Sequence, residues 1–333
     1  MNKNTPQQYI SNFDVNKLEK NISINNNLKK NLVQKLNKGL SDKNISNTLN
    51  AAIELHCSGY FSSVLKKLIE YYFNEINIEQ IQFIHYIVDF MNYYSKYSSV
   101  KKTAVNNIVN DQVIRNFICF FGTLLINSTQ RKLIKLPKIK QKDFDLNTQK
   151  QNIISKDLNT VSKFITELDP KEIIIPLSEI CNYFVNTNYS DREHKIIYWI
   201  SWLFEYEKIY HKNTLIVSER VVSGIDKKHH KDFIWIVWTI IKYYSNESNK
   251  IFIYRLFDLF IINYTKASRK SKSNILITAV MIIVNPLSTI KYPVKKLSIE
   301  QYRAASLHEL RCNEYYLKLF QNTIINQCNQ INN

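Results

Sequence analysis

The chain has 333 residues, of which 45 are lysine or arginine and 28 are acidic, so its formal net charge is +17. Its only four glycines (39, 59, 122 and 224) are isolated, which excludes glycine-rich phosphate loops, dinucleotide fingerprints and nucleophile elbows. There are only six prolines as well, so the many turns of a β-sandwich or barrel are also excluded and an all-α fold is predicted.

The N-terminal half predicts a polar tail followed by helices. The tail covers residues 1–25 and the helical region covers 26–130. A leucine stripe predicts a helix from Asn26 that stops at Gly39. Asn77, with Gln80 three residues later, predicts a capping box that opens another helix. The further helices expected in this region cover 49–59, 61–73, 77–97 and 105–127.

Residues 131–157 interrupt this helical pattern and predict a basic linker or a long exposed loop. Six basic residues precede the first acid of the segment, Asp143. They are Arg131, Lys132, Lys135, Lys138, Lys140 and Lys142.

Residues 158–333 predict a C-terminal helical bundle. All four tryptophans fall there in two pairs, Trp199 with Trp202 and Trp235 with Trp238. The i, i+3 spacing places each pair on one helix face. We therefore expect two antiparallel core helices that meet on their aromatic faces, within an irregular multi-helix bundle or helical stack of one or two subdomains.

Other helix starts in this half carry capping signals. Asp169 followed by Pro170 predicts one start, and Ser190 with Glu193 predicts a capping box at another. Later helices are expected over 250–264, over 274–284 and, capped by Ser298, over 299–326.

Three basic corners fall in predicted loops and are candidate contacts for nucleic acid or another polyanion. The first is 131–142, described above. The second contains Lys227, Lys228 and Lys231, and the third contains Lys266, Arg269, Lys270 and Lys272. The alternative is that these lysines are merely solvated, because an AT-rich genome would produce the same excess of Lys, Asn, Ile and Tyr.

No motif predicts catalysis, a metal site or a cofactor. His229 and His230 are adjacent, so their side chains diverge, and Glu205 and Glu207 have a spacing that separates their carboxylates on a helix. The histidines at 194 and 211 are expected near opposite ends of one helix and its follower. Cys57 follows His56 directly and is expected to be a small core residue.

The five cysteines are widely scattered, which indicates a reducing, intracellular compartment. The longest apolar runs are too short to span a bilayer, so no membrane insertion is expected. The sequence leaves the oligomeric state open.

Three short blocks carry a resemblance: ELHCSGYF at 54–61, YWISWLFEYEK at 198–208 and DFIWIVW at 232–238. These blocks resemble segments of a group of uncharacterised proteins encoded by giant DNA viruses related to mimivirus. The resemblance implies a genomic origin and no activity.

These observations favour a non-enzymatic accessory protein that acts by binding, with nucleic acid held by the lysine-rich loops. The alternative is a helical protein–protein scaffold or virion component whose basicity reflects codon bias. An enzyme whose site is assembled from distant residues is the third class, which a deep pocket would favour.

Overall fold

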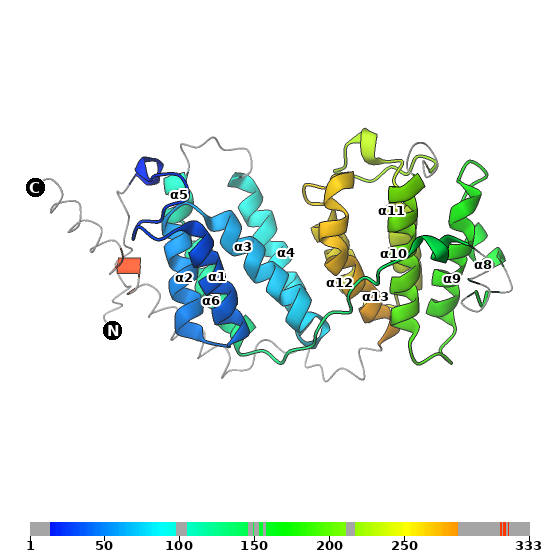
Figure 1. The fold of residues 1–333 in the computed structure, drawn as a ribbon, viewed down its shortest axis with the longest axis horizontal. Coiled ribbons are helices and arrows are strands. Elements are labelled where there is room, and N and C mark those ends of the chain that lie inside the picture. Colours follow the sequence, from blue (N-terminus) through cyan, green and yellow to red (C-terminus); the bar gives the residue numbers. More distant parts are fainter. Residues whose placement is uncertain are drawn as a thin grey trace, which may run out of the picture. The chain divides into compact units, whose positions relative to one another are not determined.

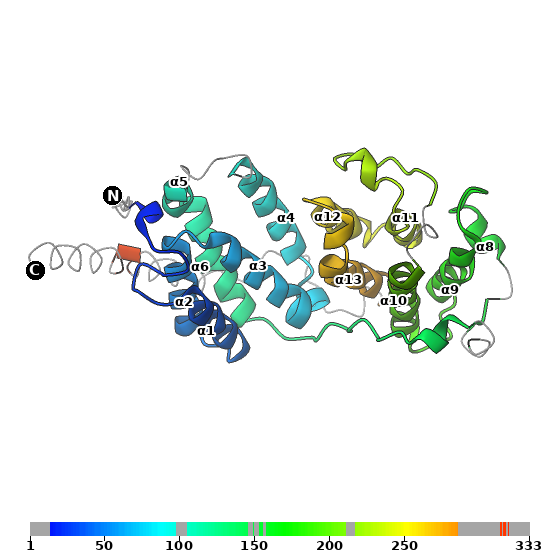
Figure 2. The same ribbon diagram turned by 45° about the horizontal axis from the view of Figure 1, so that its top comes forward.

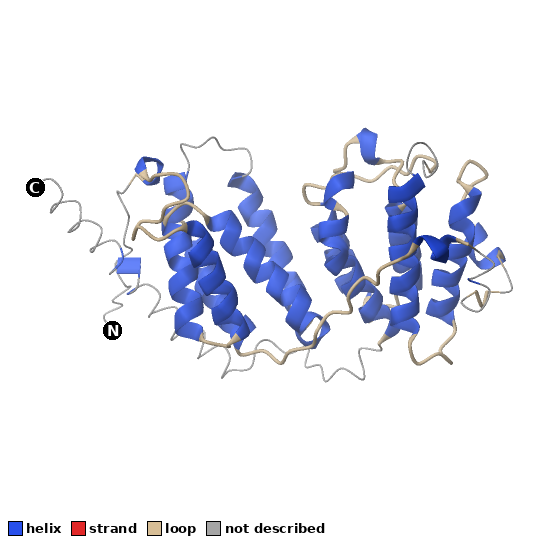
Figure 3. Cartoon of the chain, viewed as in Figure 1, coloured by secondary structure: helices blue, strands red, loops and turns tan. Residues whose placement is uncertain are grey.

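The structure is a computed structural model that describes residues 14–97, 105–145, 149, 153–155, 158–210, 217–285, 314, 316, 317 and 319. Within these residues there are twelve α-helices joined by short 3-10 turns and loops, and no β-strand (Figure 3). The prediction of an all-α fold is confirmed. None of the described helices combines the length and the apolar character needed to cross a membrane.

The helices belong to two compact units. One comprises Met1–Ile76, Asp89–Gln130 and Pro293–Asn333, and the other comprises Asn77–Val88 and Arg131–Tyr292. The chain passes from one unit to the other after Gln130, where the sequence analysis expected a linker to begin. The described residues of the expected linker belong to the second unit.

In the first unit, α1 lies beside α2 in both views (Figures 1 and 2). A Cβ added to Gly39 would lie 2.7 Å from the backbone nitrogen of Thr48, so glycine permits this close approach. The expectation that Gly39 ends the helix is wrong, since α1 continues to Ser41. The helices of this unit are α1 (Lys29–Ser41), α2 (Ile45–Cys57), α3 (Phe61–Tyr71), α5 (Val105–Asn110) and α6 (Gln112–Ile126), with part of α4 (Phe83–Tyr94).

Residues 14–25 are tied to this unit, contrary to the expected loose tail. Ser23 and Ile24 are buried. The Ser23 hydroxyl donates to a carboxylate oxygen of Glu54 at 2.6 Å, and the Ile24 amide donates to the Ser58 hydroxyl at 3.0 Å. Polar side chains here make internal hydrogen bonds, which the composition of the tail did not reveal. Residues 1–13 of the predicted tail lie outside the described residues.

Two expected helices of the N-terminal half are interrupted. The helix predicted over 105–127 breaks at Asp111, whose carboxylate accepts from the amides of Val113 and Ile114 and so caps α6. The capping box predicted at Asn77 does not form, because Asn77 has a φ of 39° and lies in a 3-10 turn. The following α-helix begins only at Phe83.

In the second unit, α10 packs between α9 and α13, and α12 packs against α11 and α13 (Figure 1). The helices of this unit are α8 (Asn159–Ser162), α9 (Ile174–Val185), α10 (Arg192–Tyr210), α11 (Ile234–Tyr244), α12 (Lys250–Ile261) and α13 (Ser273–Val284). The apolar residues of α13 are buried almost throughout. The bounds of this helix agree with the predicted 274–284 to within one residue.

All four tryptophans are buried, but the two pairs do not meet. Trp235 and Trp238 contact the rings of Phe257 and Phe260 on α12. No ring contact joins a tryptophan of α10 to one of α11 within the described part of the chain. The expectation of two helices meeting on aromatic faces is wrong, because each face finds a different partner.

The predicted caps of α9 and α10 are used elsewhere. A 3-10 turn, Lys171–Ile173, precedes α9, and the Asp169 carboxylate instead accepts hydrogen bonds from Arg220 at 2.6 Å and from the Ser218 amide at 2.8 Å. The carboxylate of Glu193 accepts from the side-chain amide of Asn285. The helix predicted over 299–326 lies almost wholly outside the described residues.

Candidate functional site

Residues 131–145, here called the strap, run as an extended segment that ends in a 3-10 turn, Gln141–Phe144 (green in Figures 1 and 2). The strap is fixed to α10. The hydroxyl of Ser201 donates to the Pro137 carbonyl at 2.7 Å, and the indole N–H of Trp202 donates to the Asp143 carbonyl at 2.9 Å. This part of the predicted linker or exposed loop is therefore anchored to α10.

The two ends of the strap have further anchors. At its start, the backbone carbonyl of Arg131 accepts from the side-chain amide of Asn77. The guanidinium of Arg131 lies 3.6 Å from the carboxylate of Glu79. At its end, the ring of Phe144 lies 5.2 Å from that of Trp202. Apolar side chains between these anchors are half-buried, namely Leu133, Ile134, Leu136 and Ile139. Burial on one side of the strap holds its backbone in place while the other side faces solvent.

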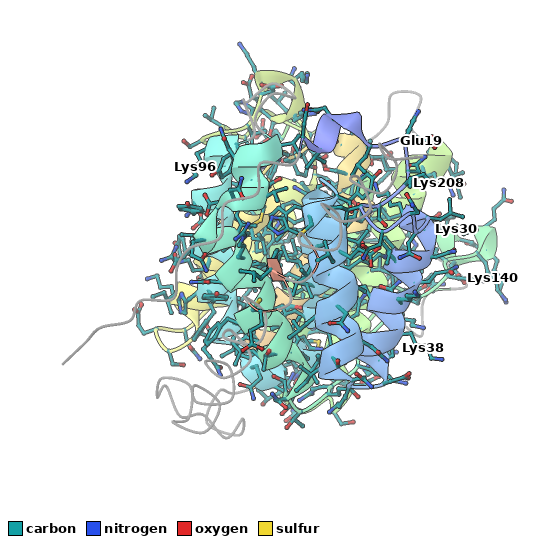
Figure 4. All side chains as sticks on the ribbon, turned by 90° about the vertical axis from the view of Figure 1, so that its left-hand side faces the viewer. Glu19, Lys30, Lys38, Lys96, Lys140 and Lys208 are labelled. Carbon is teal, nitrogen blue, oxygen red and sulfur yellow. The ribbon has the colours of Figure 1, made fainter. Side chains whose placement is uncertain are left out.

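The lysines of the strap occupy its solvent side. Lys132, Lys135, Lys138 and Lys140 are exposed, and none of them makes an ion pair within the described residues. Figure 4 shows Lys140 projecting from the ribbon. Lys142 is exposed as well. The strap therefore presents uncompensated positive charge on a fixed backbone.

Two cavities lie between the strap and α10, one on each side of Pro137. One has a volume of about 280 Å³ and is lined by residues that include Ile134, Tyr198 and Trp199. The other has a volume of about 270 Å³ and is lined by residues that include Ile139 and Phe204. Both are small and open beside the strap lysines.

The second basic corner is partly neutralised. The ammonium of Lys228 lies 3.1 Å from the carboxylate of Asp226. Lys227 and Lys231 are exposed, and neither forms an ion pair within the described part of the chain. His230 is buried, and its Nε2 hydrogen-bonds the Ile225 carbonyl at 3.0 Å. This corner leaves only two lysines available to a polyanion.

All four basic residues of the third corner have partners within the described residues, although Lys266 and Lys270 are exposed. The Arg269 side chain is 7% exposed, and its guanidinium bonds the carboxylates of Glu207 and Asp232, whose side chains are 6% and 2% exposed. Its guanidinium also lies 5.0 Å and 4.5 Å from the ring centroids of Phe204 and Phe233, which contact each other. Because the guanidinium is buried and bonds two carboxylates, Arg269 is not available to a phosphate.

The lysines around Arg269 also have internal partners. Lys266 lies 2.7 Å from the Glu207 carboxylate, and Lys270 lies 2.7 Å from that of Glu205. The ammonium of Lys272 donates to the carbonyls of Phe260 and Ile262 at the end of α12. Burial lowers the pKa of Lys272 to about 8. The lysines of this corner are therefore paired with neighbouring carbonyls and carboxylates.

The carboxylates of Glu205 and Glu207 have different surroundings. The hydrogen bond from Lys270 lowers the pKa of Glu205. Glu207, expected at a solvated helix end, is instead buried beside Arg269. Glu207, Arg269 and Asp232 form a structural ion cluster that the sequence reasoning missed, since its members are more than twenty residues apart.

The adjacent His56 and Cys57 are fully buried. The ring of His56 hydrogen-bonds the hydroxyl of Tyr316 at 2.7 Å and the Ile108 carbonyl at 3.0 Å. Burial lowers the pKa of His56 to about 3 and raises that of the Cys57 thiol. A neutral thiol in the core cannot act as a nucleophile, so this pair has a packing role.

Among the residues that the structure describes, no three His, Cys, Asp or Glu side chains come together to hold a metal ion. Residue 211, one of the four histidines near the tryptophans, lies outside these residues. His194 is exposed near the start of α10.

The anchoring of the strap was also missed, although the sequence contains a signal for it. Lysines 132, 135 and 138 recur every third residue, with apolar residues at 133, 134, 136 and 139 between and beside them. A repeat of three residues is that of an extended polyproline II segment, in which such lysines share one side. It lacks the period of a helix, which is why the stretch was interpreted as a loop.

Comparison with protein-family models, with curated proteins and with solved structures gives no match for this chain. The resemblance to giant-virus proteins stays a prediction.

Proposed function

We propose that the protein is a non-enzymatic accessory protein that binds nucleic acid through the strap. The observation that carries this proposal is the row of four exposed lysines, at 132, 135, 138 and 140, on a backbone anchored to α10. The other basic corners contribute less, because internal partners occupy most of their charges.

The spacing of these lysines suits a polyanion. In an extended chain, a step of three residues covers about 10 Å, which is comparable to the Debye length in physiological salt. The positive potentials of neighbouring lysines therefore overlap, and a phosphate backbone laid along the strap would release counterions at several of them. Because the strap backbone is already ordered, binding would not require the ordering of this segment.

The experiment is a salt-dependent binding measurement with a labelled oligonucleotide. A variant with Lys→Gln changes at the four strap positions should bind less tightly and show a weaker salt dependence. Loss of four phosphate contacts changes the slope of log K against log salt by about 2.8 for a single strand, which corresponds to about fiftyfold in affinity between 50 and 200 mM salt.

A matched control carries the same loss of charge at lysines that already have acidic partners. These are Lys66, Lys67, Lys208 and Lys250, which pair with Glu70, Glu70, Glu205 and Glu247. The control variant should keep most of the affinity and of the salt slope. Equal weakening of both variants would show that net charge alone drives binding and would refute the strap as the interface.

No binding at low salt would remove the proposal. The alternative, a helical scaffold or virion component that binds other proteins, would then become the function to test. The internal pairing of Arg269, Lys266 and Lys270 supports that alternative, since much of the positive charge has structural partners.

A further inference from the structure

We propose that the cavity beside Trp199 accepts one base of a single-stranded nucleic acid whose phosphates lie along the strap. This inference rests on the proposed function and deepens it, because it names the strand type and the contact with a base. It concerns the cavity of about 280 Å³ between the strap and the first half of α10.

The size of the cavity suits one small ring system. It is much larger than the roughly 30 Å³ that a water molecule occupies in the liquid. It is smaller than the ~300–1,000 Å³ of pockets that enclose drug-sized ligands. A single base fits between these limits, and a single strand can offer one, whereas the bases of a duplex are paired and stacked on their neighbours.

The walls of the cavity have the chemistry that bases require. Ile134 and Pro137 of the strap and Ile197 of α10 supply apolar surface, and the half-buried Tyr198 supplies an aromatic ring. Aromatic and apolar surfaces stack with the faces of bases regardless of sequence.

The charged lining residues favour a base over a phosphate as the occupant. Lys135 and Lys195 line the cavity, but so does Asp191, and its carboxylate would oppose an anion placed inside. Lys135 is exposed and Lys195 is half-buried. The two ammonium groups can therefore contact the phosphates that flank an inserted base.

The wall of the cavity also contains a polar group without a partner in the described part of the chain, the indole N–H of Trp199. Trp199 lines this cavity and is 1% exposed, and its indole N–H has no hydrogen-bond acceptor among the described residues. In contrast, the indole N–H groups of Trp202 and Trp235 donate to the carbonyls of Asp143 and His229. Trp238 also has an unpartnered N–H, but it lines neither cavity. The N–H itself is closed to solvent, so Trp199 contributes packing surface to the cavity wall and an acceptor would reach the N–H only after that wall shifts.

The test compares three probes of about 12 nucleotides at low salt: a thymidine strand, an abasic strand with the same phosphates, and a duplex. The protein should bind the thymidine strand at least about fivefold more tightly than the abasic strand, which is the smaller effect expected for one stacked base. A fluorescence-anisotropy titration gives the three affinities.

Two matched variants locate the effect. Ile134→Trp fills the proposed cavity, and Ile139→Trp fills the cavity on the other side of Pro137 without changing any charge. Ile134→Trp should lose the preference for the base-bearing strand and keep its affinity for the abasic strand. Ile139→Trp should keep the preference.

The outcomes separate this inference from the proposed function. If the protein binds none of the probes, the proposed function fails. If it binds the thymidine and abasic strands equally, the strap remains an interface and the base-binding cavity is refuted. Equal loss of preference in the Ile134 and Ile139 variants, with unchanged helical circular dichroism, would also overturn the assignment of the cavity.

Discussion

Replacement of Arg269 by Met should destabilise the second unit strongly. The guanidinium of Arg269 bonds the buried carboxylates of Glu207 and Asp232 and lies against the rings of Phe204 and Phe233. Met preserves much of the packing against these rings but leaves Asp232 without a cationic partner within the described residues. Removal of one member of a buried ion pair costs about 3–5 kcal/mol, because the other charge remains desolvated.

Urea unfolding followed by tryptophan fluorescence isolates this effect, since all four tryptophans lie in the second unit. Lys270→Met is the control: it removes an ion pair with Glu205 in which the lysine side chain is 65% exposed, so it should cost no more than about 1 kcal/mol. A triple variant that adds Glu207→Gln and Asp232→Asn should recover part of the loss, because no buried charge then lacks a partner.

A loss below about 1 kcal/mol for Arg269→Met, equal to that of the control, would refute the reasoning. Such a result would mean that water can solvate the two carboxylates without the guanidinium.

Two further predictions concern the first unit, which contains no tryptophan and is followed by amide hydrogen exchange. Gly39→Ala should destabilise this unit by about 1–3 kcal/mol, since the new methyl group meets the backbone of Thr48. Gly122→Ala should cost less, because its methyl group meets only a side-chain methyl. Equal losses in the two variants would contradict the argument that glycine at position 39 permits the close approach of α1 to α2. The stability of this unit should also fall as the pH drops below 6.5. His56 stays neutral in the folded state down to a pKa of about 3, whereas the unfolded chain takes up the proton at its ordinary pKa of 6.5. The loss reaches about 2 kcal/mol at pH 5 and levels off below pH 3; a His56→Leu variant should show a smaller pH slope, and an unchanged slope would assign the effect to other groups.

Most helices could be predicted because their signal is local. The apolar period of α13 and the burial of the tryptophans follow from residues within a few turns of one another. Helix ends were predicted less well. Asp169 and Glu193 have the side chains of caps, yet each bonds a residue distant in sequence, Arg220 and Asn285 respectively. A distant partner can compete with a local cap, and the sequence does not show which one is nearer.

The candidate site was predicted only in part. The lysines of the strap were named from composition, but the anchoring of the strap and the cavity beside Trp199 were not. Both depend on contacts between the strap and α10, which is about sixty residues away in sequence.

The sequence by itself determined that the protein is helical, rich in lysine and without glycine-rich phosphate loops, because these properties depend on composition and local periodicity. Only the tertiary structure decided which positive charges remain available to a partner. Arg269 is 62 residues from Glu207, and Lys270 is 65 residues from Glu205, so their neutralisation depends on how α10 packs against the turn that precedes α13. The strap lysines stay exposed because only the apolar side of the strap is buried against the helix, and no nearby described carboxylate pairs with them.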